Sequence, residues 1–195
     1  MKVSREKARE NHERVIDTAA TLLRERGYDG IGVADLMKAA GLTHGGFYRN
    51  FASKDDLLVQ ATRHALDTSR DVLAQAQAES PEATFRALVE RYVSSAHCDD
   101  AGGGCILPAL AADAARRDDP ALRQVFADAV AAYLRHLATL APPAGTDGTP
   151  PRPPAAILAE MVGAVVLARA LGEGEASQAL LDEVVDDLAG KAPRG

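Results

Sequence analysis

Aromatic residues and cysteine are both scarce in this sequence of 195 residues. There is no tryptophan, aromatic residues make up 4% of the chain, and only two cysteines are present. Two cysteines are too few for a disulfide framework, and so small a number is typical of proteins in the reducing cytoplasm. Hydrophobic residues still make up 47% of the chain. Because alanine and leucine dominate them, we expect a core built from helices.

Long apolar runs and alternating patterns are missing as well. No uninterrupted apolar run reaches the roughly 18 residues that suggest a membrane span. The charged start MKVSREKARENHERV lacks the apolar segment of a secretory signal. We therefore expect a cytoplasmic protein with no membrane partner. No stretch alternates apolar and polar residues as a half-buried strand does, so the predicted fold class is all-α.

The chain has no overall positive charge, but its charge is unevenly distributed. The net charge is −6, with +3 on residues 1–54 and −9 on residues 55–195. An acidic body with a mildly basic N-terminal part is compatible with a DNA-binding module joined to a second domain. Ordinary fluctuation of charge along a chain explains the same numbers equally well. Charge alone therefore leaves the function open.

Apolar spacing and helix start and stop signals divide the chain into helical segments. Ser53 followed by Asp56 is close to a capping box, which begins a long helix. Residues 142–154 hold six of the ten prolines, so we expect a loop there. The predicted helices are one ending at Gly27, followed by residues 33–40, 44–51, 54–78, 81–98, 106–116, 120–140, 155–171 and 176–189.

The last two predicted helices offer more apolar surface than a small bundle can cover. Residues 155–171 contain only two charged side chains, Glu160 and Arg169, so apolar groups surround most of this helix. Residues 176–189 add a second apolar stripe. A homodimer interface formed by these two helices accounts for both patterns. The alternative is a helix buried entirely within one chain.

The stretch GLTHGGFYRNF, residues 41–51, has the proportions of the second half of a helix-turn-helix. Thr43 is placed as its N-cap, Leu42 and Phe47 as a hydrophobic staple, and Phe47 and Phe51 on one core-facing side. Each of the two glycines weakens a helix by about 1 kcal/mol relative to alanine. In exchange, a bare first turn lets a phosphate or a base edge come close. Alternatively, the glycines only lengthen the turn.

Residues 27–58, GYDGIGVADLMKAAGLTHGGFYRNFASKDDLL, resemble the DNA-binding domain of the TetR family of bacterial transcriptional regulators. Spacing and residue type agree over about residues 10–60. The resemblance implies an all-helical homodimer, usually a repressor, whose C-terminal domain binds a small effector and releases operator DNA. It implies two domains. Residues 1–53 form a three-helix DNA-binding domain that contains the helix-turn-helix, and residues 54–195 form an effector-binding and dimerisation domain.

The resemblance also implies which residues contact double-stranded operator DNA. Thr43, Tyr48 and Lys54 have the chemistry to bind phosphates, whereas His44 and Arg49 are suited to reading bases, with Asn50 a further candidate. Gly32 departs from the family, which usually has Ser or Thr there to cap a helix and touch phosphate. The positions that match the family's DNA-contacting region are Thr43, His44, Gly45, Gly46, Tyr48, Arg49, Asn50 and Lys54.

The middle helices are where the resemblance places the effector pocket. Their apolar and aromatic groups would suit a weakly polar or aromatic ligand. Ordinary core packing explains the same residues, because periodicity does not separate core from pocket. The candidate ligand-binding residues are Phe85, Leu88, Tyr92, Leu107, Leu110, Phe126 and Tyr133.

The segment HCDDAGGGCILPALAAD, residues 97–113, is unusual in its three glycines before Cys105. At the first turn of a helix the dipole lowers the pKa of a thiol. Similar Gly-Cys segments occur in a branch of TetR-like repressors, some of which respond to electrophiles or oxidants. Cys105, with Cys98, is therefore a candidate redox sensor. The alternatives are a buried structural cysteine, or metal binding together with His97; we expect no metal.

An enzyme is the main competing class. His97 with either cysteine lacks a recognisable third group, and the sequence has no cofactor fingerprint. We therefore expect no enzymatic activity and no cofactor. The predicted function is a ligand-responsive repressor, released from a near-palindromic operator by a small weakly polar or electrophilic effector. The alternative is a TetR-like activator or a ligand-independent DNA-binding protein.

Overall fold

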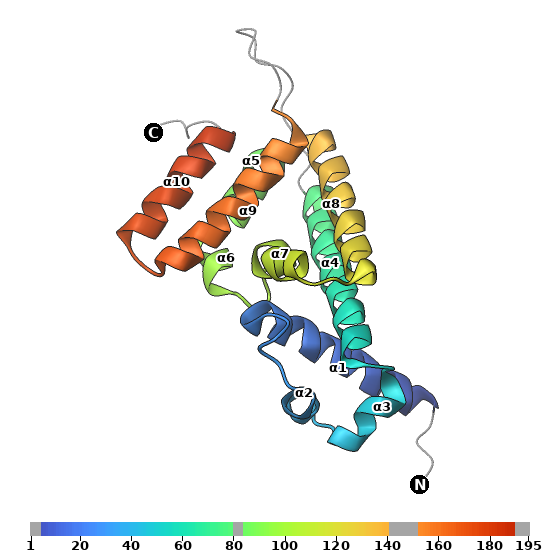
Figure 1. Ribbon diagram of the computed structural model, residues 1–195. Helices are drawn as coiled ribbons and strands as arrows, with labels where there is room; N and C mark the ends of the chain where they lie inside the picture. The colour runs from blue at the N-terminus through green and yellow to red at the C-terminus, as the bar shows by residue number, and fades with distance from the viewer. Residues whose placement is uncertain (1–4, 80–83, 141–151, 190–195) are drawn as a thin grey trace. The chain divides into compact units, whose positions relative to one another are not determined.

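The computed structural model describes residues 5–79, 84–140 and 152–189, with side-chain surroundings for 5–69, 85–140 and 152–189. Within these ranges the regular elements are helices, and no strand occurs (Figure 1). The predicted all-α class is therefore confirmed. The elements are α1 (Arg5–Arg26), α2 (Val33–Ala39), the 3₁₀ helix η1 (His44–Gly46), α3 (Phe47–Asn50), α4 (Lys54–Glu79), α5 (Thr84–Tyr92), α6 (Ser95–Asp99), α7 (Ile106–Arg116), α8 (Pro120–Leu140), α9 (Pro154–Leu171) and α10 (Glu175–Ala189).

Packing divides the chain into two compact units. The first contains the described residues up to Ser69 together with Ala101–Phe126, and the second contains Arg70–Asp100 together with the described residues from Ala127 onward. α4 and α8 therefore contribute residues to both units. The family resemblance implies a different division, at residue 53, between a DNA-binding domain and an effector-binding domain. The packing units do not test this functional division. That division remains a prediction.

The core of the first unit is formed by side chains from α1, α2, α3, α4, α7 and the start of α8, together with Tyr28. α1 ends where Gly27 adopts φ +72°, a conformation that favours glycine, as predicted for the stop of this helix. α1 packs against both α2 and α7. Fully buried side chains of this core are Val15, Leu23, Tyr28, Met37, Phe47, Leu57, Ile106, Leu110 and Leu122.

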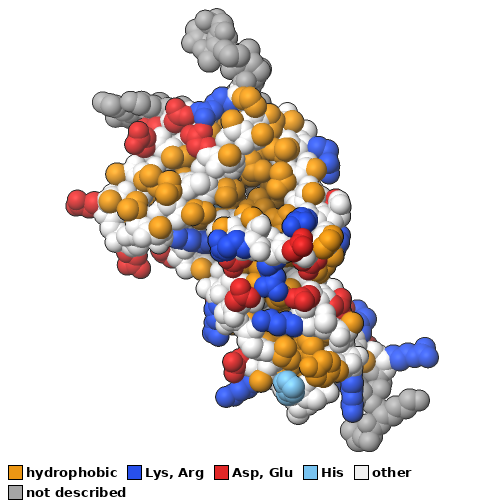
Figure 2. Space-filling view, in the orientation of Figure 1, with side chains coloured by type: hydrophobic (Ala, Val, Ile, Leu, Met, Phe, Trp, Pro, Cys, Tyr) orange, Lys and Arg blue, Asp and Glu red, His pale blue; other side chains and the backbone are white. Residues whose placement is uncertain are grey.

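The second unit contains the paired C-terminal helices α9 and α10, which lie side by side in Figure 1. Buried residues of α9 repeat at helical spacing from Ile157 to Ala168. The opposite side of the same helix is also apolar but exposed, with Leu167 at 55% and Leu171 at 54% of their full accessibility. Figure 2 shows apolar side chains gathered on the visible face over α9 and α10. The prediction that apolar groups surround this helix is confirmed.

The prediction of one helix over residues 81–98 is wrong, because the described part of this stretch forms two helices. α5 ends at Tyr92 and α6 begins at Ser95, with Ser94 in an extended conformation between them (φ −143°, ψ 154°). The Ser94 hydroxyl accepts a hydrogen bond from the His97 N–H at 3.2 Å, which is an N-cap contact. The sequence carries this signal, since Ser94 is a good N-cap residue. The start signal at residues 80–82 lies outside the described residues.

One helix in the described part of the chain, α9, is long and apolar enough to cross a membrane by length and composition alone. Its buried stripe packs within the second unit, as a core helix of a globular domain does. Most of the predicted proline-rich loop, residues 142–151, lies outside the described residues. Its final two prolines form the start of α9, with Pro153 at the N-cap and Pro154 at the first helical position.

Candidate nucleic-acid interface

The turn between α2 and η1 has a defined geometry that follows from one glycine. Gly41 adopts φ +70°, and its N–H donates to the Lys38 carbonyl at 3.0 Å. The next N–H, of Leu42, donates to the Met37 carbonyl at 2.8 Å. This pair of bonds is the Schellman pattern, which ends a helix sharply and needs a residue that tolerates positive φ. Gly41 therefore sets the direction in which the chain enters residues 43–51, the recognition segment.

Two phenylalanines anchor the recognition segment to the first unit. Phe47 and Phe51 are both buried, and their ring centroids lie 5.5 Å apart. His12 of α1 stacks on Phe51 with centroids 4.7 Å apart. The prediction that the two phenylalanines share a core-facing side is confirmed. Burying each ring contributes about 2–3 kcal/mol, which is enough to hold a segment too short to be stable alone.

The predicted helix over residues 44–51 is shorter and less regular than expected. His44–Gly46 form a 3₁₀ turn, and only Phe47–Asn50 form an α-helical turn. Thr43 occupies the N-cap position of the 3₁₀ turn, but its side chain makes no capping hydrogen bond. The prediction that Thr43 caps this helix is therefore right in position and wrong in mechanism. Gly32, the departure from the family, likewise gives α2 no side-chain cap.

Neither glycine of the 3₁₀ turn is required by the fold of the free protein. Gly45 and Gly46 do not have positive φ. A Cβ at Gly45 would meet no atom within 4 Å, and one at Gly46 would only touch the Met37 methyl at 3.5 Å and the Thr43 hydroxyl at 3.8 Å. Alanine would therefore fit at both positions and would strengthen the helix.

The outward side of the recognition segment is polar, aromatic and basic. His44 and Arg49 are exposed, and Tyr48 exposes 68% of its surface, an unusual value for an aromatic residue. The His44 and Tyr48 rings meet edge to face with centroids 6.3 Å apart. The Asn50 amide donates to the Gly46 carbonyl at 2.8 Å, so it already holds the glycine turn. The structure thus brings seven of the eight predicted DNA-contacting residues into one segment.

Lys54, the eighth, is the first residue of α4 and is held by a capped helix start. The Ser53 hydroxyl accepts from the Asp56 N–H at 3.0 Å, and the Asp56 carboxylate accepts from the Ala52 N–H at 3.0 Å. A capping box would return to the Ser53 N–H, so the predicted pattern is present with its second bond one residue earlier. Hydrogen bonds from Gln60 and then from Ala52 lower the pKa of Asp56 below its usual range.

Replacing Ser53 by Ala is expected to lower the free energy of unfolding by about 0.5–2 kcal/mol. The stabilisation from Asp56 is present above the pKa of an unfolded aspartate, near 3.9, and disappears as the pH falls through the lower folded pKa. Urea unfolding of Ser53→Ala and Asp56→Asn at pH 7 and pH 3.5 measures both effects. Ser69→Ala, a mid-helix serine on α4, is the control. The cap assignment is wrong if Ser53→Ala unfolds at the wild-type denaturant concentration.

The predicted ligand-binding residues are distributed over both packing units. Leu107 and Leu110 are buried in the first unit, and Tyr92 and Tyr133 are buried in the second. The apolar and aromatic groups in each unit are compatible both with ordinary core packing and with contact to a weakly polar ligand. Their role in ligand binding therefore stays a prediction. The remaining candidates are half-buried: Phe126 in the first unit, and Phe85 and Leu88 in the second.

The two cysteines lie in different surroundings and do not form a disulfide. Cys105 occupies the N-cap position of α7 and is buried. Cys98, in α6, is half-buried, and burial raises the pKa of its thiol. Burial restricts the access of an electrophile to Cys105, and the raised pKa of Cys98 disfavours its reactive thiolate. These surroundings suit the structural alternative, and the redox-sensor role stays a prediction. In the described part of the chain, no group of three His, Cys, Asp or Glu side chains is arranged to hold a metal.

His97, the first residue of the segment 97–113, has a structural partner in the second unit. Its Nδ1 lies 2.6 Å from the Tyr92 carbonyl. Burial lowers the pKa of His97 below the usual value for histidine, so the neutral ring donates to this carbonyl. Arg169 of α9 donates to the carbonyls of His97 and Cys98 at 2.9 and 3.1 Å. These contacts hold α6 against α9.

Comparison with known proteins agrees with the geometry of the recognition segment. Residues 15–61 match the sequence model of "Bacterial regulatory proteins, tetR family". A solved TetR transcriptional regulator from Chloroflexus aurantiacus is 28% identical and superposes with a TM-score of 0.76 over 94% of each chain.

Three curated relatives are HTH-type transcriptional regulators. Rv0196 of Mycobacterium tuberculosis is 29% identical over 163 residues, 80% of this chain and 83% of that protein. YwcC of Bacillus subtilis is 47% identical over 47 residues, 24% of this chain and 21% of that protein. IcaR of Staphylococcus aureus, named a negative transcriptional regulator of a biofilm operon, is 29% identical over 68 residues, 35% of this chain and 37% of that protein. The chain therefore spans only about a fifth of YwcC and a third of IcaR.

The matched residues contain the Schellman turn, the anchoring phenylalanines and the exposed glycine turn. The likeness to the solved regulator extends the agreement to the helical remainder of the chain. Sequence, local geometry and whole-chain fold thus agree: residues 15–61 match the TetR family of bacterial regulatory proteins, and the chain has the fold of a TetR transcriptional regulator.

Proposed function

We propose that the protein is a ligand-responsive repressor that binds a near-palindromic operator as a homodimer. The observation that carries this proposal is the exposed turn His44–Gly46, whose two glycines are required neither by positive φ nor by lack of space for a Cβ in the free protein. A bare turn next to an exposed histidine, tyrosine and arginine is what a helix end needs to approach the backbone and base edges of DNA closely.

The residues of this segment divide by chemistry into two roles. Tyr48, Thr43 and Lys54 bind phosphate oxygens and fix the register on the duplex. His44 and Arg49 reach base edges in the major groove, where arginine pairs with the O6 and N7 atoms of guanine. Asn50 acts mainly on the protein side, because its amide is bonded to the Gly46 carbonyl. It therefore keeps the glycine turn in shape rather than reading bases as its primary role.

A second copy of the chain covers the exposed apolar side of α9. Val166, Leu167 and Leu171 are large apolar side chains exposed on this helix. Isolated monomers rarely expose contiguous patches of this kind unless the patch is functional. An interface in which α9 and α10 pack against the same helices of a partner is self-complementary, as a two-fold dimer requires. The two recognition segments then meet half-sites about one DNA turn, ~34 Å, apart.

Repression and ligand response are supported by relatives and by composition. IcaR is named as a negative regulator, which favours repression over activation. The aromatic and aliphatic candidates from Phe85 to Tyr133 favour a weakly polar effector. An electrophilic effector is less favoured, because Cys105 is buried and burial raises the pKa of the Cys98 thiol. We place the protein in the cytoplasm, acting on DNA without enzymatic activity.

The proposal is tested by selecting duplexes from a random library with the wild-type protein and footprinting the enriched sequence. We expect a near-palindromic site protected on both half-sites, and a dimer in analytical ultracentrifugation. A library of weakly polar aromatic compounds is then screened for release of that duplex, with the Cys98→Ser/Cys105→Ser variant tested in parallel. Release unchanged in the variant supports the weakly polar class. Failure to enrich any sequence refutes the operator-binding function. If a duplex is selected but no compound releases it, the alternative of a ligand-independent DNA-binding protein is favoured.

A further inference from the structure

We propose that Arg117 is a positioning residue that holds both ends of the helix-turn-helix segment and so presets it for operator DNA. The proposal rests on the DNA-binding function above. Arg117 follows α7 as its C-cap residue, far from residues 33–50 in the sequence. No sequence motif marks it, and it is not among the predicted DNA-contacting residues.

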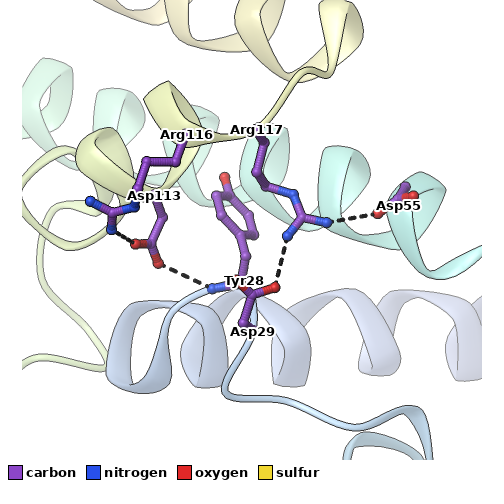
Figure 3. Close-up of polar contacts among 6 residues, drawn as sticks. All are labelled: Tyr28, Asp29, Asp55, Asp113, Arg116 and Arg117. Atoms are coloured by element: carbon purple, nitrogen blue, oxygen red, sulfur yellow. Dashed lines mark hydrogen bonds and ion pairs between the residues drawn. The ribbon is translucent and has the colours of Figure 1, made fainter.

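A single guanidinium binds one carboxylate on each side of the recognition segment. Nη1 of Arg117 donates to Asp29 at 2.9 Å, and Nη2 donates to Asp55 at 3.0 Å, as Figure 3 shows. Asp29 precedes α2, and Asp55 follows α3 in the first turn of α4. The chain between these carboxylates is the helix-turn-helix. Arg117 therefore closes this segment into a loop and joins both of its ends to the junction of α7 and α8.

The guanidinium is itself held in place by a buried aromatic residue. Its central carbon lies 5.6 Å from the centroid of the Tyr28 ring, a cation–π distance. The Tyr28 hydroxyl lies 2.9 Å from the Thr62 hydroxyl of α4, and both side chains are fully buried. Burial raises the pKa of Tyr28 to about 12, so the phenol stays neutral. Only 27% of the Arg117 side chain remains exposed.

A second contact from α7 reaches the same turn. The Tyr28 N–H donates to the Asp113 carboxylate at 3.3 Å, and Asp113 also pairs with Arg116. Gly27 makes room for this carboxylate: a Cβ there would lie 2.5 Å from an Asp113 oxygen. The last turn of α7 and its C-cap thus contact three successive residues, Gly27, Tyr28 and Asp29. A shift of this end of α7 would move the residues that lead into the helix-turn-helix directly.

Energetics favour a role in positioning over one in stability. Asp29 and Asp55 expose 93% and 66% of their side chains, and ion pairs with such exposed partners add little stability. Arginine nevertheless suits the geometry, because its planar fork donates to both carboxylates at once, whereas a lysine ammonium is a single point. Removing the fork should therefore loosen the recognition segment without unfolding the protein.

The test compares Arg117→Ala and Arg117→Lys with Arg123→Ala. Arg123 of α8 is a matched control, because it pairs with exposed Asp118, which lies just before that helix. Fluorescence anisotropy measures affinity for the duplex selected by the wild-type protein, at several salt concentrations. Hydrogen exchange of residues 30–53 is measured in the free proteins. If Arg117→Ala unfolds, Asp29→Ala and Asp55→Ala each remove one arm of the fork and take its place.

We expect Arg117→Ala to weaken binding by about 5- to 30-fold, Arg117→Lys to recover only part of it, and Arg123→Ala to match the wild type. The salt slope should stay unchanged, because no phosphate contact is removed. Exchange of residues 30–53 should be faster in Arg117→Ala. A slope lower by about one would make Arg117 a phosphate contact instead, and wild-type exchange rates would overturn the proposal. If the wild type selects no duplex, the operator function fails, and hydrogen exchange still decides the role of Arg117.

Discussion

Replacing both His44 and Arg49 by alanine is expected to lower affinity for the selected operator by about 30-fold or more, while thermal unfolding stays within about 1–2 °C of the wild type. Each base-reading side chain contributes about 1–3 kcal/mol of discrimination, and 1.4 kcal/mol corresponds to a tenfold change. Both side chains are exposed, so their loss leaves no cavity in the core. Binding to the selected duplex and to a scrambled duplex, measured side by side, separates recognition from general attraction.

The control for this double variant is Arg135→Ala, which removes one positive charge from an exposed position on α8. It should bind like the wild type. The double variant should also lose preference for the selected duplex over the scrambled one, because phosphate contacts are common to both. Unchanged affinity and preference in His44→Ala/Arg49→Ala would remove this segment from DNA recognition.

Leu167→Asp/Leu171→Asp is expected to convert the dimer into a folded monomer and to lower operator affinity by at least about 100-fold. The two leucines lie one helical turn apart and expose 55% and 54% of their surface, so aspartate at these positions meets water in the monomer. In a dimer the same four carboxylates would be buried at a self-complementary interface, where unpaired charges are very costly. Loss of the partner removes the second half-site, and linking two sites commonly adds 10²–10⁴ in affinity.

A matched control introduces the same charges elsewhere at the same spacing. Ala111 and Ala115 are exposed on α7, and Ala111→Asp/Ala115→Asp should remain dimeric. Sedimentation and far-UV circular dichroism on both variants give oligomeric state and helicity. A Leu167→Asp/Leu171→Asp protein that still sediments as a dimer places the interface elsewhere. A protein that loses its helicity shows instead that this side of α9 belongs to the monomer's core.

The sequence predicted those parts of the fold that depend on local signals. Gly27 and Gly41 mark helix ends because their positive φ is a local requirement. Phe47 and Phe51 were placed in the core because apolar residues four apart on a short helix share one side. The start of α4 followed from Ser53 in the same way. Each of these inferences needs only neighbouring residues.

Other features depend on contacts between residues far apart in the sequence, and the spacing of apolar residues along the chain does not predict such contacts. The pairing of Arg117 with Asp29 and Asp55 joins residues 88 and 62 positions apart. The division of the ligand candidates over two packing units has the same cause. The sequence pattern does not predict the break at Ser94 for a different reason: a continuous apolar pattern outweighs a single capping residue. Thr43 shows the converse, since a good N-cap residue in the right position makes no capping bond.

The recognition segment separates what keeps it folded from what it presents to solvent. Phe47 and Phe51 face the core, while His44, Gly45 and Arg49 face outward and contribute little to packing. Outward positions can therefore change during evolution without loss of the fold, and under the proposed function each change would alter the set of DNA sequences that the protein selects. A gene duplicate of this chain could acquire a new operator through two or three substitutions. Its helical scaffold would stay as it is.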